Sequence, residues 1–385
     1  MRSLISSLAF PGCVGLFSLL PVIAQSQLHP ESIEAAYRYS ASHSGRALII
    51  HEQGKLRTER YYNGLAKGTP VHIYSGTKSF FAVLALIAQE EGLLSLDERV
   101  ADSLPEWRND ARKSQITIRD LLNFTSGLET GFQEIYGRSN ANKLTLSIGL
   151  DAQRDRGSAF IYGPGHLQVF CEVLNRKLSQ KAIRLGYEEY LNKKLIRPLG
   201  IDITRWRADA HGNVIPSAGM YMTGLDWLNF GKMILADGRW KGRQLVRPES
   251  LRECFLGTQI NPSFGLCFWL NTYKDQPGAW EVDVEERLEE KPLPEDWRNA
   301  CLAKGAPSDL VVSLGSTFQR LYLVPSMDLA IVHHGRPGHD FRDFDFLRIL
   351  FEKAGSPTQA SNVSSPQERT TRPILKRLFQ KSEGE

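Results

Sequence analysis

Residues 77–91 restrict the fold of this chain more than any other segment. Most positions in this run are apolar or small, and its large apolar side chains are Phe80, Phe81, Val83, Leu84, Leu86 and Ile87. No proline or glycine interrupts the run, so we expect a helix. A helix that is apolar all round must be covered by protein on every side. The segment therefore predicts a helix through the middle of the molecule.

Ser75 and Lys78 lie three residues apart where this helix begins. Side chains at this spacing project from the same helix face, so the amine can reach the hydroxyl. Burial and the positive end of a helix both disfavour a charged lysine, and a neutral amine can act as a base for a serine nucleophile. The spacing thus indicates acyl transfer on Ser75. The alternative is a serine that caps the helix beside a surface lysine.

Composition indicates a globular protein of one large domain or two lobes. The 385 residues are 42% hydrophobic and 23% charged, with a net charge of +4. We expect no nucleic-acid partner, because the basic excess is small and lies partly in the C-terminal tail. We also expect no metal and no cofactor. The acidic and histidine cluster near the C-terminus does not suggest a metal site, because adjacent residues on a strand point to opposite faces. Its members are His333, His334, His339, Asp340 and Asp343.

The two ends of the chain differ in composition from the rest. Residues 1–24 resemble a secretory signal, with Arg2, a long apolar stretch and a small-residue cleavage site at 22–24. We therefore expect an exported protein, periplasmic or extracellular, with no stable membrane span after cleavage. A retained membrane anchor and a lipoprotein modified at Cys13 are the alternatives. Residues 356–385 are rich in polar and basic residues and are expected to be a disordered tail.

Export would leave four cysteines in the mature chain. They are Cys171, Cys254, Cys267 and Cys301. If all were oxidised, three pairings would be possible, and the sequence does not select one. Their spacing contains no C-x-x-C motif, so a zinc or redox site is not indicated.

Periodicity and turn signals predict an α/β (α+β) fold. Two β-rich runs, 46–51 and 56–62, flank Gln53-Gly54 as a hairpin. Thr117 and Asp120 form a capping box that opens a helix ending near Gly127. Further helices are expected at 166–178, 226–236 and 341–351, and further strands at 264–270, 310–313, 320–324 and 329–333, the last two joined by a turn at 325–328.

Strands at both ends with helices between them imply one discontinuous sheet. We expect an antiparallel sheet flanked by helices plus a mostly helical lobe, in one domain over 25–355. The sheet lobe would take residues from about 45–75 and 210–355, and the helical lobe about 76–209. The polar segment 271–307 is expected to be a surface insertion with a solvated acidic face. That face would contain Glu285, Glu286, Glu289 and Glu290.

Four further segments accompany the serine and lysine in a recognisable order. They are 118–128 (IRDLLNFTSGL), 160–164 (FIYGP), 198–201 (PLGI) and 217–223 (SAGMYMT). With Ser75-Gly76-Thr77-Lys78, they make the chain resemble the serine β-lactamase and penicillin-binding-protein superfamily over roughly residues 45–350. The resemblance is greatest to its class C-like branch of esterases, D-aminopeptidases and 6-aminohexanoate-oligomer hydrolases.

This resemblance implies roles for individual residues. Ser75 would be the acylated nucleophile, Lys78 its proton acceptor, and Tyr162 a proton shuttle for the leaving group. A phenol beside an ammonium is expected to ionise below its usual pKa near 10. The family's lysine-threonine-glycine motif aligns with Ser313-Leu314-Gly315, and the amides of Ser75 and Ser316 would form the oxyanion hole.

The sequence departs from the family pattern at two positions. Pro164 stands where the family has an asparagine, and Ser313 stands where it has a lysine that helps to bind a carboxylate. The resemblance therefore favours a small-molecule ester or amide without that carboxylate over a β-lactam or a D-alanyl peptide. A catalytically idle binding or sensor domain is a further alternative. A Ser-His-Asp hydrolase is not favoured, because the chain has no G-x-S-x-G motif.

Overall fold

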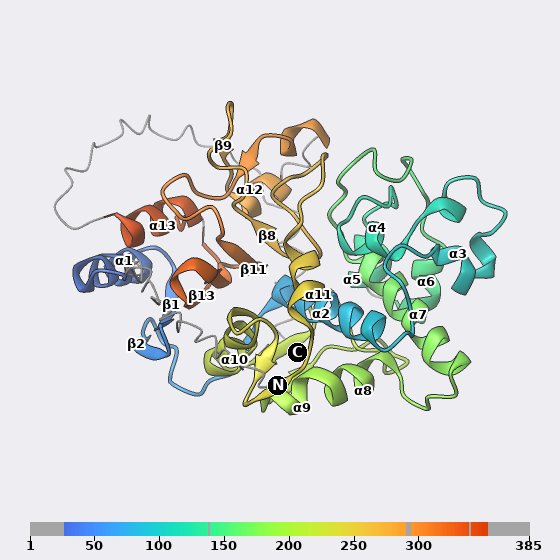
Figure 1. Cartoon of the computed structure of the whole chain (residues 1–385), viewed down its shortest axis with the longest axis horizontal. Helices are drawn as coiled ribbons and strands as arrows, with labels where there is room; N and C mark the ends of the chain where they lie inside the picture. The colour runs from blue at the N-terminus through green and yellow to red at the C-terminus, as the bar shows by residue number, and fades with distance from the viewer. Residues whose placement is uncertain (1–26, 138, 290–293, 339, 353–385) are drawn as a thin grey trace, which may run out of the picture.

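The computed structural model describes residues 27–137, 139–289, 294–338 and 340–352 (Figure 1). The predicted signal, the predicted tail, Cys13, Glu290 and His339 lie outside these residues. Within them, no helix is both long and apolar enough to cross a lipid bilayer.

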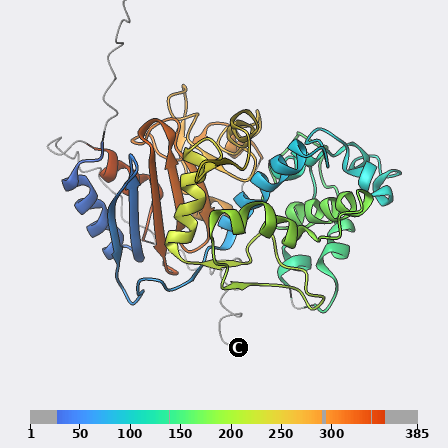
Figure 2. The ribbon, with the colours of Figure 1, turned by 60° about the horizontal axis from the view of Figure 1, so that its bottom comes forward.

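A six-stranded antiparallel sheet forms one side of the molecule (Figure 2). Its strands are β1 (Gly45–Glu52), β2 (Lys55–Tyr61), β8 (Trp269–Leu270), β11 (Val311–Gly315), β12 (Gln319–Val324) and β13 (Leu329–Gly335). Their order is β2-β1-β13-β12-β11-β8, so strands from the two ends of the chain pair in the middle of the sheet. The predicted antiparallel sheet and the β1–β2 hairpin are confirmed.

Helices cover both faces of this sheet (Figure 2). On one face lie α1 (Pro30–Ser42) and α13 (Asp343–Phe351), which pack against each other. On the other face, α10 (Gly224–Leu235) packs on β12 and β13. A capping box formed by Thr223 and Asp226 fixes the start of α10.

The helix α2 (Thr77–Glu90) runs between the sheet and the remaining helices (Figure 1). Every residue from Thr77 to Ala88 is buried, so the predicted central helix is confirmed. To the right of α2 and below it in Figure 1 lie α3 (Val100–Ser103), α4 (Ile118–Leu122), α5 (Phe132–Tyr136), α6 (Lys143–Ile148), α7 (Gly165–Gln180), α8 (Tyr187–Leu191) and α9 (Arg197–Leu199).

Further short strands and α-helices lie between these elements. They are β3 (Val71–His72), β4 (Arg205–Trp206), β5 (Met220–Met222), β6 (Arg239–Trp240), β7 (Arg243–Gln244), β9 (Trp280–Glu281), β10 (Ala300–Cys301), α11 (Pro248–Arg252) and α12 (Val284–Glu289). The strands β3, β5 and β4 form a small antiparallel sheet, and this sheet leads the chain towards α2.

Two predicted boundaries were wrong, because backbone turns override the apolar pattern. The expected strand 264–270 is reduced to β8, since Cys267 has a φ of 56° and its amide donates to the Leu122 carbonyl. The helix opened by the Thr117 capping box ends at Leu122 and not near Gly127, because Phe124 takes a left-handed φ of 60°.

The segment 271–307 is not the solvated insertion that its polarity predicted. It contains β9, α12 and β10, and several of its side chains are fully buried: Trp297, Ala300, Cys301 and Ala303. Glu285 was expected on a solvated face, yet its carboxylate binds two backbone amides and a buried arginine. A polar segment can therefore pack against the sheet when its charged groups find partners inside the protein.

The four cysteines are buried free thiols, so none of the possible pairings is formed. They lie on separate elements, with Cys171 in α7 and Cys301 in β10.

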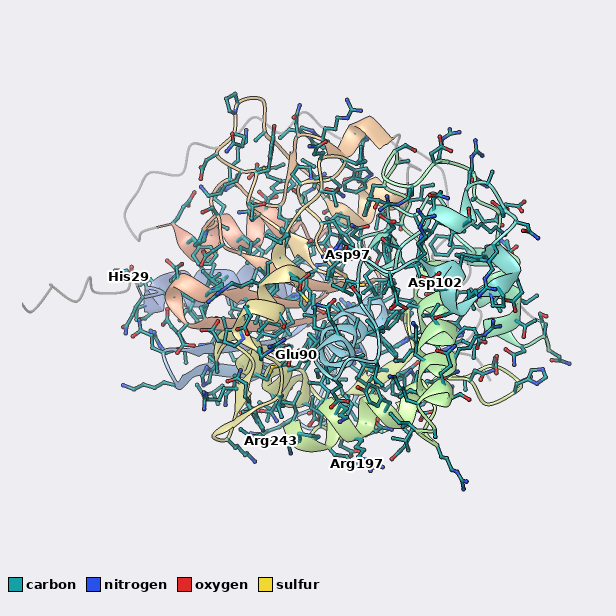
Figure 3. The ribbon with its side chains drawn as sticks, turned by 45° about the vertical axis from the view of Figure 1, so that its right-hand side comes forward. His29, Glu90, Asp97, Asp102, Arg197 and Arg243 are labelled. Carbon is teal, nitrogen blue, oxygen red and sulfur yellow. The ribbon has the colours of Figure 1, made fainter. Side chains whose placement is uncertain are left out.

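Charged side chains of both signs are exposed at the surface. Examples are Asp97, Asp102, Arg197 and Arg243 (Figure 3). No group of His, Cys, Asp or Glu side chains among the described residues is arranged to hold a metal ion.

Candidate active site

Ser75 lies in a short 3-10 turn, η1 (Tyr74–Gly76), that runs directly into α2. The residue before it, Tyr74, has a φ of 46°. A left-handed backbone costs a non-glycine residue about 1–2 kcal/mol, and such strain is concentrated at functional sites. Ser75 itself is half-buried, whereas its neighbours in the turn are buried. The turn therefore presents the Ser75 hydroxyl at the end of a fixed helix.

Lys78 places its amine beside this hydroxyl. Its Nζ lies 2.8 Å from Ser75 Oγ and donates to the Ser217 carbonyl at 2.7 Å. The side chain is almost completely buried, and burial lowers its pKa from 10.5 to about 7. The serine does not cap the helix and the lysine is not on the surface, so the alternative reading of this pair was wrong.

Tyr162 lies on the other side of the nucleophile, in the loop before α7. Its phenol hydrogen-bonds with Ser75, and Lys78 Nζ lies 4.9 Å from the centre of its ring. An aromatic cluster holds the ring, including Phe124 at 5.1 Å and Trp269 at 6.0 Å between ring centres.

The pKa of Tyr162 is shifted opposite to expectation. Burial raises it above the usual value near 10, although the hydrogen bond with Ser75 lowers it somewhat. The predicted ionisation below 10 was wrong, because burial disfavours a phenolate. The phenol therefore holds its proton at neutral pH and can donate it.

No motif in the sequence indicated a second tyrosine in this site, Tyr136. It ends α5, within the region 129–159 that contains no readable motif. Its hydroxyl lies 2.9 Å from Ser217 Oγ, and the carbonyl of the same Ser217 accepts from Lys78. Burial raises the pKa of the Tyr136 phenol as well, so it stays neutral. A longer-range contact of this kind depends on the fold and not on local spacing.

The end of β11 lies against the segment that leads to Ser75. A Cβ atom on Gly315 would come within 2.0 Å of the Ile73 carbonyl oxygen, two residues before the nucleophile. Glycine is therefore required here for the close approach of the protein's own backbone. Ser316 follows directly, at the start of the turn to β12, and is half-buried.

Ser313 has a different environment from the one predicted for a substrate-binding residue. Its hydroxyl is fully buried, donates to the Gly76 carbonyl at 3.1 Å and lies 2.9 Å from Ser79 Oγ. These contacts join β11 to the start of α2. Ser313 thus holds the strand beside the nucleophile and supplies no cation to a substrate.

The two adjacent histidines of β13 have different hydrogen-bond partners. His333 lies 2.7 Å from Ser40 Oγ through Nε2 and donates from Nδ1 to the Phe318 carbonyl at 2.8 Å. His334 contacts Gln319 instead. The predicted opposite orientation of these adjacent side chains agrees with these separate partners.

The sequence profile of the β-lactamase family matches residues 31–283. The chain belongs to the β-lactamase family. The match ends just before Glu285, so β11, with Ser313, Gly315 and Ser316, lies beyond it. The fold confirms the β-lactamase/transpeptidase-like architecture that the motifs implied.

A curated protein resembles part of this chain. Monacolin J acid methylbutanoyltransferase of Aspergillus terreus is 32% identical over 158 residues, which cover 34% of this chain and 37% of that enzyme. The chain thus matches little more than a third of the length of this relative.

Two solved structures share the fold over most of this chain. The D-stereospecific amidohydrolase from Streptomyces has a TM-score of 0.58 at 15% identity, covering 85% of this chain and 98% of its own. EstCE1, a hydrolase with promiscuous acyltransferase activity, also has a TM-score of 0.58 at 15% identity, covering 84% and 98%. At this identity the likeness concerns the fold alone.

Proposed function

We propose that this member of the β-lactamase family is a serine hydrolase that cleaves an ester or amide through an acyl-enzyme on Ser75. The observation that carries the proposal is the contact between Lys78 Nζ and Ser75 Oγ at 2.8 Å, formed by a lysine whose pKa is about 7. At neutral pH such an amine is neutral in a large fraction of molecules and can accept the serine proton.

In the proposed acylation, Lys78 takes the Ser75 proton while Oγ attacks the substrate carbonyl. The carbonyl oxygen gains negative charge and is bound by the backbone amides of Ser75 and Ser316. Donors of this kind contribute about 3–4 kcal/mol each to transition-state stabilisation in comparable enzymes. The position of Gly315 against Ile73 supports this arrangement, because it holds the strand end that leads to Ser316 beside the nucleophile.

Departure of the leaving group requires a proton. The neutral Tyr162 phenol, which hydrogen-bonds with Ser75, would donate it and recover a proton from the Lys78 ammonium. Water would then attack the acyl-enzyme, with the same groups acting in reverse. This assignment uses Tyr162 first as an acid, in agreement with its raised pKa.

The substrate that we propose lacks the carboxylate of penicillins and D-alanyl peptides. Pro164 directly precedes α7 and has no side-chain amide to orient a carbonyl, and the Ser313 hydroxyl is engaged by Gly76 and Ser79. The site would instead offer the neutral phenol of the half-buried Tyr136. Short acyl esters and uncharged amides fit such a neutral group best. We also propose export, on the signal-like residues 1–24.

Acyl transfer to an alcohol is a second candidate function. The similarity to monacolin J acid methylbutanoyltransferase over 158 residues favours it. The same acyl-enzyme would serve both reactions, because an alcohol can replace water in the second step. Adding a small alcohol to an ester assay would separate them, since a transferase forms the new ester in preference to the free acid.

The proposal is tested with a short-chain p-nitrophenyl ester and a fluorophosphonate probe. We expect wild-type protein to release p-nitrophenol and to be labelled by the probe, and Ser75→Ala to lose both properties. Ser42→Ala, at an exposed serine that ends α1, is the control and should keep both properties. Absence of turnover in wild type, or equal turnover in Ser75→Ala, would reject the proposal and favour an idle binding domain.

A further inference from the structure

The turn between β11 and β12 has an unusual backbone. Thr317 and Phe318 follow each other with φ values of 58° and 61°. Two successive non-glycine residues in the left-handed region are costly and persist only where surrounding groups fix them. This turn begins with Ser316, directly after the Gly315 that packs on Ile73. Its shape therefore determines where the Ser316 amide lies.

Glu285 binds both amides of this strained pair. One carboxylate oxygen accepts from the Thr317 amide at 2.7 Å and the other from the Phe318 amide at 3.0 Å. Glu285 belongs to α12, more than thirty residues away in sequence. Hydrogen bonds from backbone amides to a carboxylate are stronger than neutral ones. The Glu285 side chain, which comes from a different element, thus binds both residues of the strained pair.

A fully buried arginine fixes Glu285 in turn. Arg320 Nη2 donates to Glu285 at 2.9 Å, and its Nη1 donates to the Gly315 carbonyl at 2.6 Å. Asp343 of α13 binds the same guanidinium at 2.8 and 2.9 Å. Arg320 therefore connects Gly315, the residue before the turn, with the Glu285 carboxylate that binds the turn.

The carbonyl groups of the turn also have side-chain partners. Gln319 Nε2 donates to the Thr317 carbonyl at 2.9 Å, and His333 Nδ1 donates to the Phe318 carbonyl at 2.8 Å. Glu285, Gln319 and His333 come from three different elements. Their convergence on two residues is more than a surface hairpin requires, since hairpins of this length are common without such support.

We propose that Glu285 is a positioning residue for catalysis, which holds the β11–β12 turn so that the Ser316 amide faces the Ser75 nucleophile. The inference rests on the proposed function, because it assigns the Ser316 amide to the oxyanion hole. Glu285 makes its hydrogen bonds to the turn and to Arg320, and its charge also makes a small contribution to the raised pKa of Tyr162. Its positioning effect reaches the site through the backbone of the turn.

The test compares Glu285→Gln with Glu286→Gln, its exposed neighbour on α12. Glutamine keeps the size of the side chain but cannot accept from both amides, because one of its two groups is a donor. We expect kcat for the ester to fall by about tenfold or more, with KM nearly unchanged, since an oxyanion donor acts mainly in the transition state. Affinity for a boronic acid, which forms a tetrahedral adduct, should fall by a similar factor. Glu286→Gln should match wild type.

A rescue separates positioning from a loss of folding. Thr317→Gly in the Glu285→Gln background should restore part of kcat, because glycine adopts the left-handed region without penalty. Glu285→Asp keeps the charge beside Arg320 if Glu285→Gln does not fold, and it should show a smaller loss of kcat. Unchanged kcat in Glu285→Gln, or a loss that Thr317→Gly leaves unaltered, would overturn the inference. Inactive wild-type protein would instead reject the proposed function.

Discussion

The pKa of Lys78 gives a quantitative prediction for the pH dependence of acylation. A lysine with a pKa of about 7 is neutral in about half of the molecules at pH 7, compared with about one in three thousand for an ordinary lysine with a pKa of 10.5. The acid limb of kcat/KM should therefore have its midpoint near pH 7. Below that point the rate should fall about tenfold for each pH unit, to about a hundredth of the plateau at pH 5.

This profile is measured as kcat/KM from pH 5 to 10 with a fluorogenic ester whose product signal does not depend on pH. Lys78→Arg should remove the activity across the range, because a guanidinium stays protonated. Burial is the cause of the lowered pKa, so moderate salt should move the midpoint little. A midpoint above pH 9, or activity retained in Lys78→Arg, would refute Lys78 as the base.

The same shift in pKa affects stability. Below pH 7 the lysine carries its proton in both the folded and unfolded states, so burial of its charge lowers the unfolding free energy by the full amount. Between pH 7 and 10.5 only the unfolded chain binds the proton, so stability rises with pH until the cost vanishes. This cost is about 4 kcal/mol at pH 7.

Lys78→Met removes this cost together with the hydrogen bond to Ser217, so the net gain in unfolding free energy should be about 1–3 kcal/mol at pH 7. Denaturant unfolding should show this gain shrinking by pH 10, and a gain independent of pH would contradict the account.

Two further substitutions test the geometry of the site. Gly315→Ala places a Cβ within 2.0 Å of the Ile73 carbonyl and should lower kcat/KM by about a hundredfold, whereas Gly186→Ala, whose Cβ would lie 3.8 Å from its nearest neighbour, should be near wild type. Equal ester hydrolysis by both variants would count against the close packing. Tyr136→Phe removes the hydroxyl that contacts Ser217 and should lower kcat/KM for esters by about tenfold without moving the midpoint of the pH profile. An unchanged kcat/KM would show that this phenol does not contribute.

Local patterns in the sequence predicted the elements that depend on local physics. The apolar run 77–91, the Gln53-Gly54 turn and the Thr117 capping box each contain the cause of their structure within a few residues. The same holds for Ser75 and Lys78, because i to i+3 spacing on a helix brings side chains together.

Features that depend on distant contacts could not be predicted in this way. Glu285 looked solvated because its partners Thr317 and Arg320 lie far along the chain. Tyr136 had no motif, and its contact with Ser217 exists only in the folded protein. The pKa of Tyr162 was misjudged because burial, which the sequence does not reveal at a loop position, outweighs its neighbours.

The most direct test of a covalent mechanism is the mass of the protein during turnover. Wild-type protein is mixed with p-nitrophenyl acetate, quenched in acid within milliseconds, and examined by intact mass and peptide mapping. The account predicts the addition of one acetyl group on the peptide that contains Ser75, and no such adduct in Ser75→Ala. An acetyl group on another residue, or turnover with an unmodified Ser75 at every time point, would contradict it.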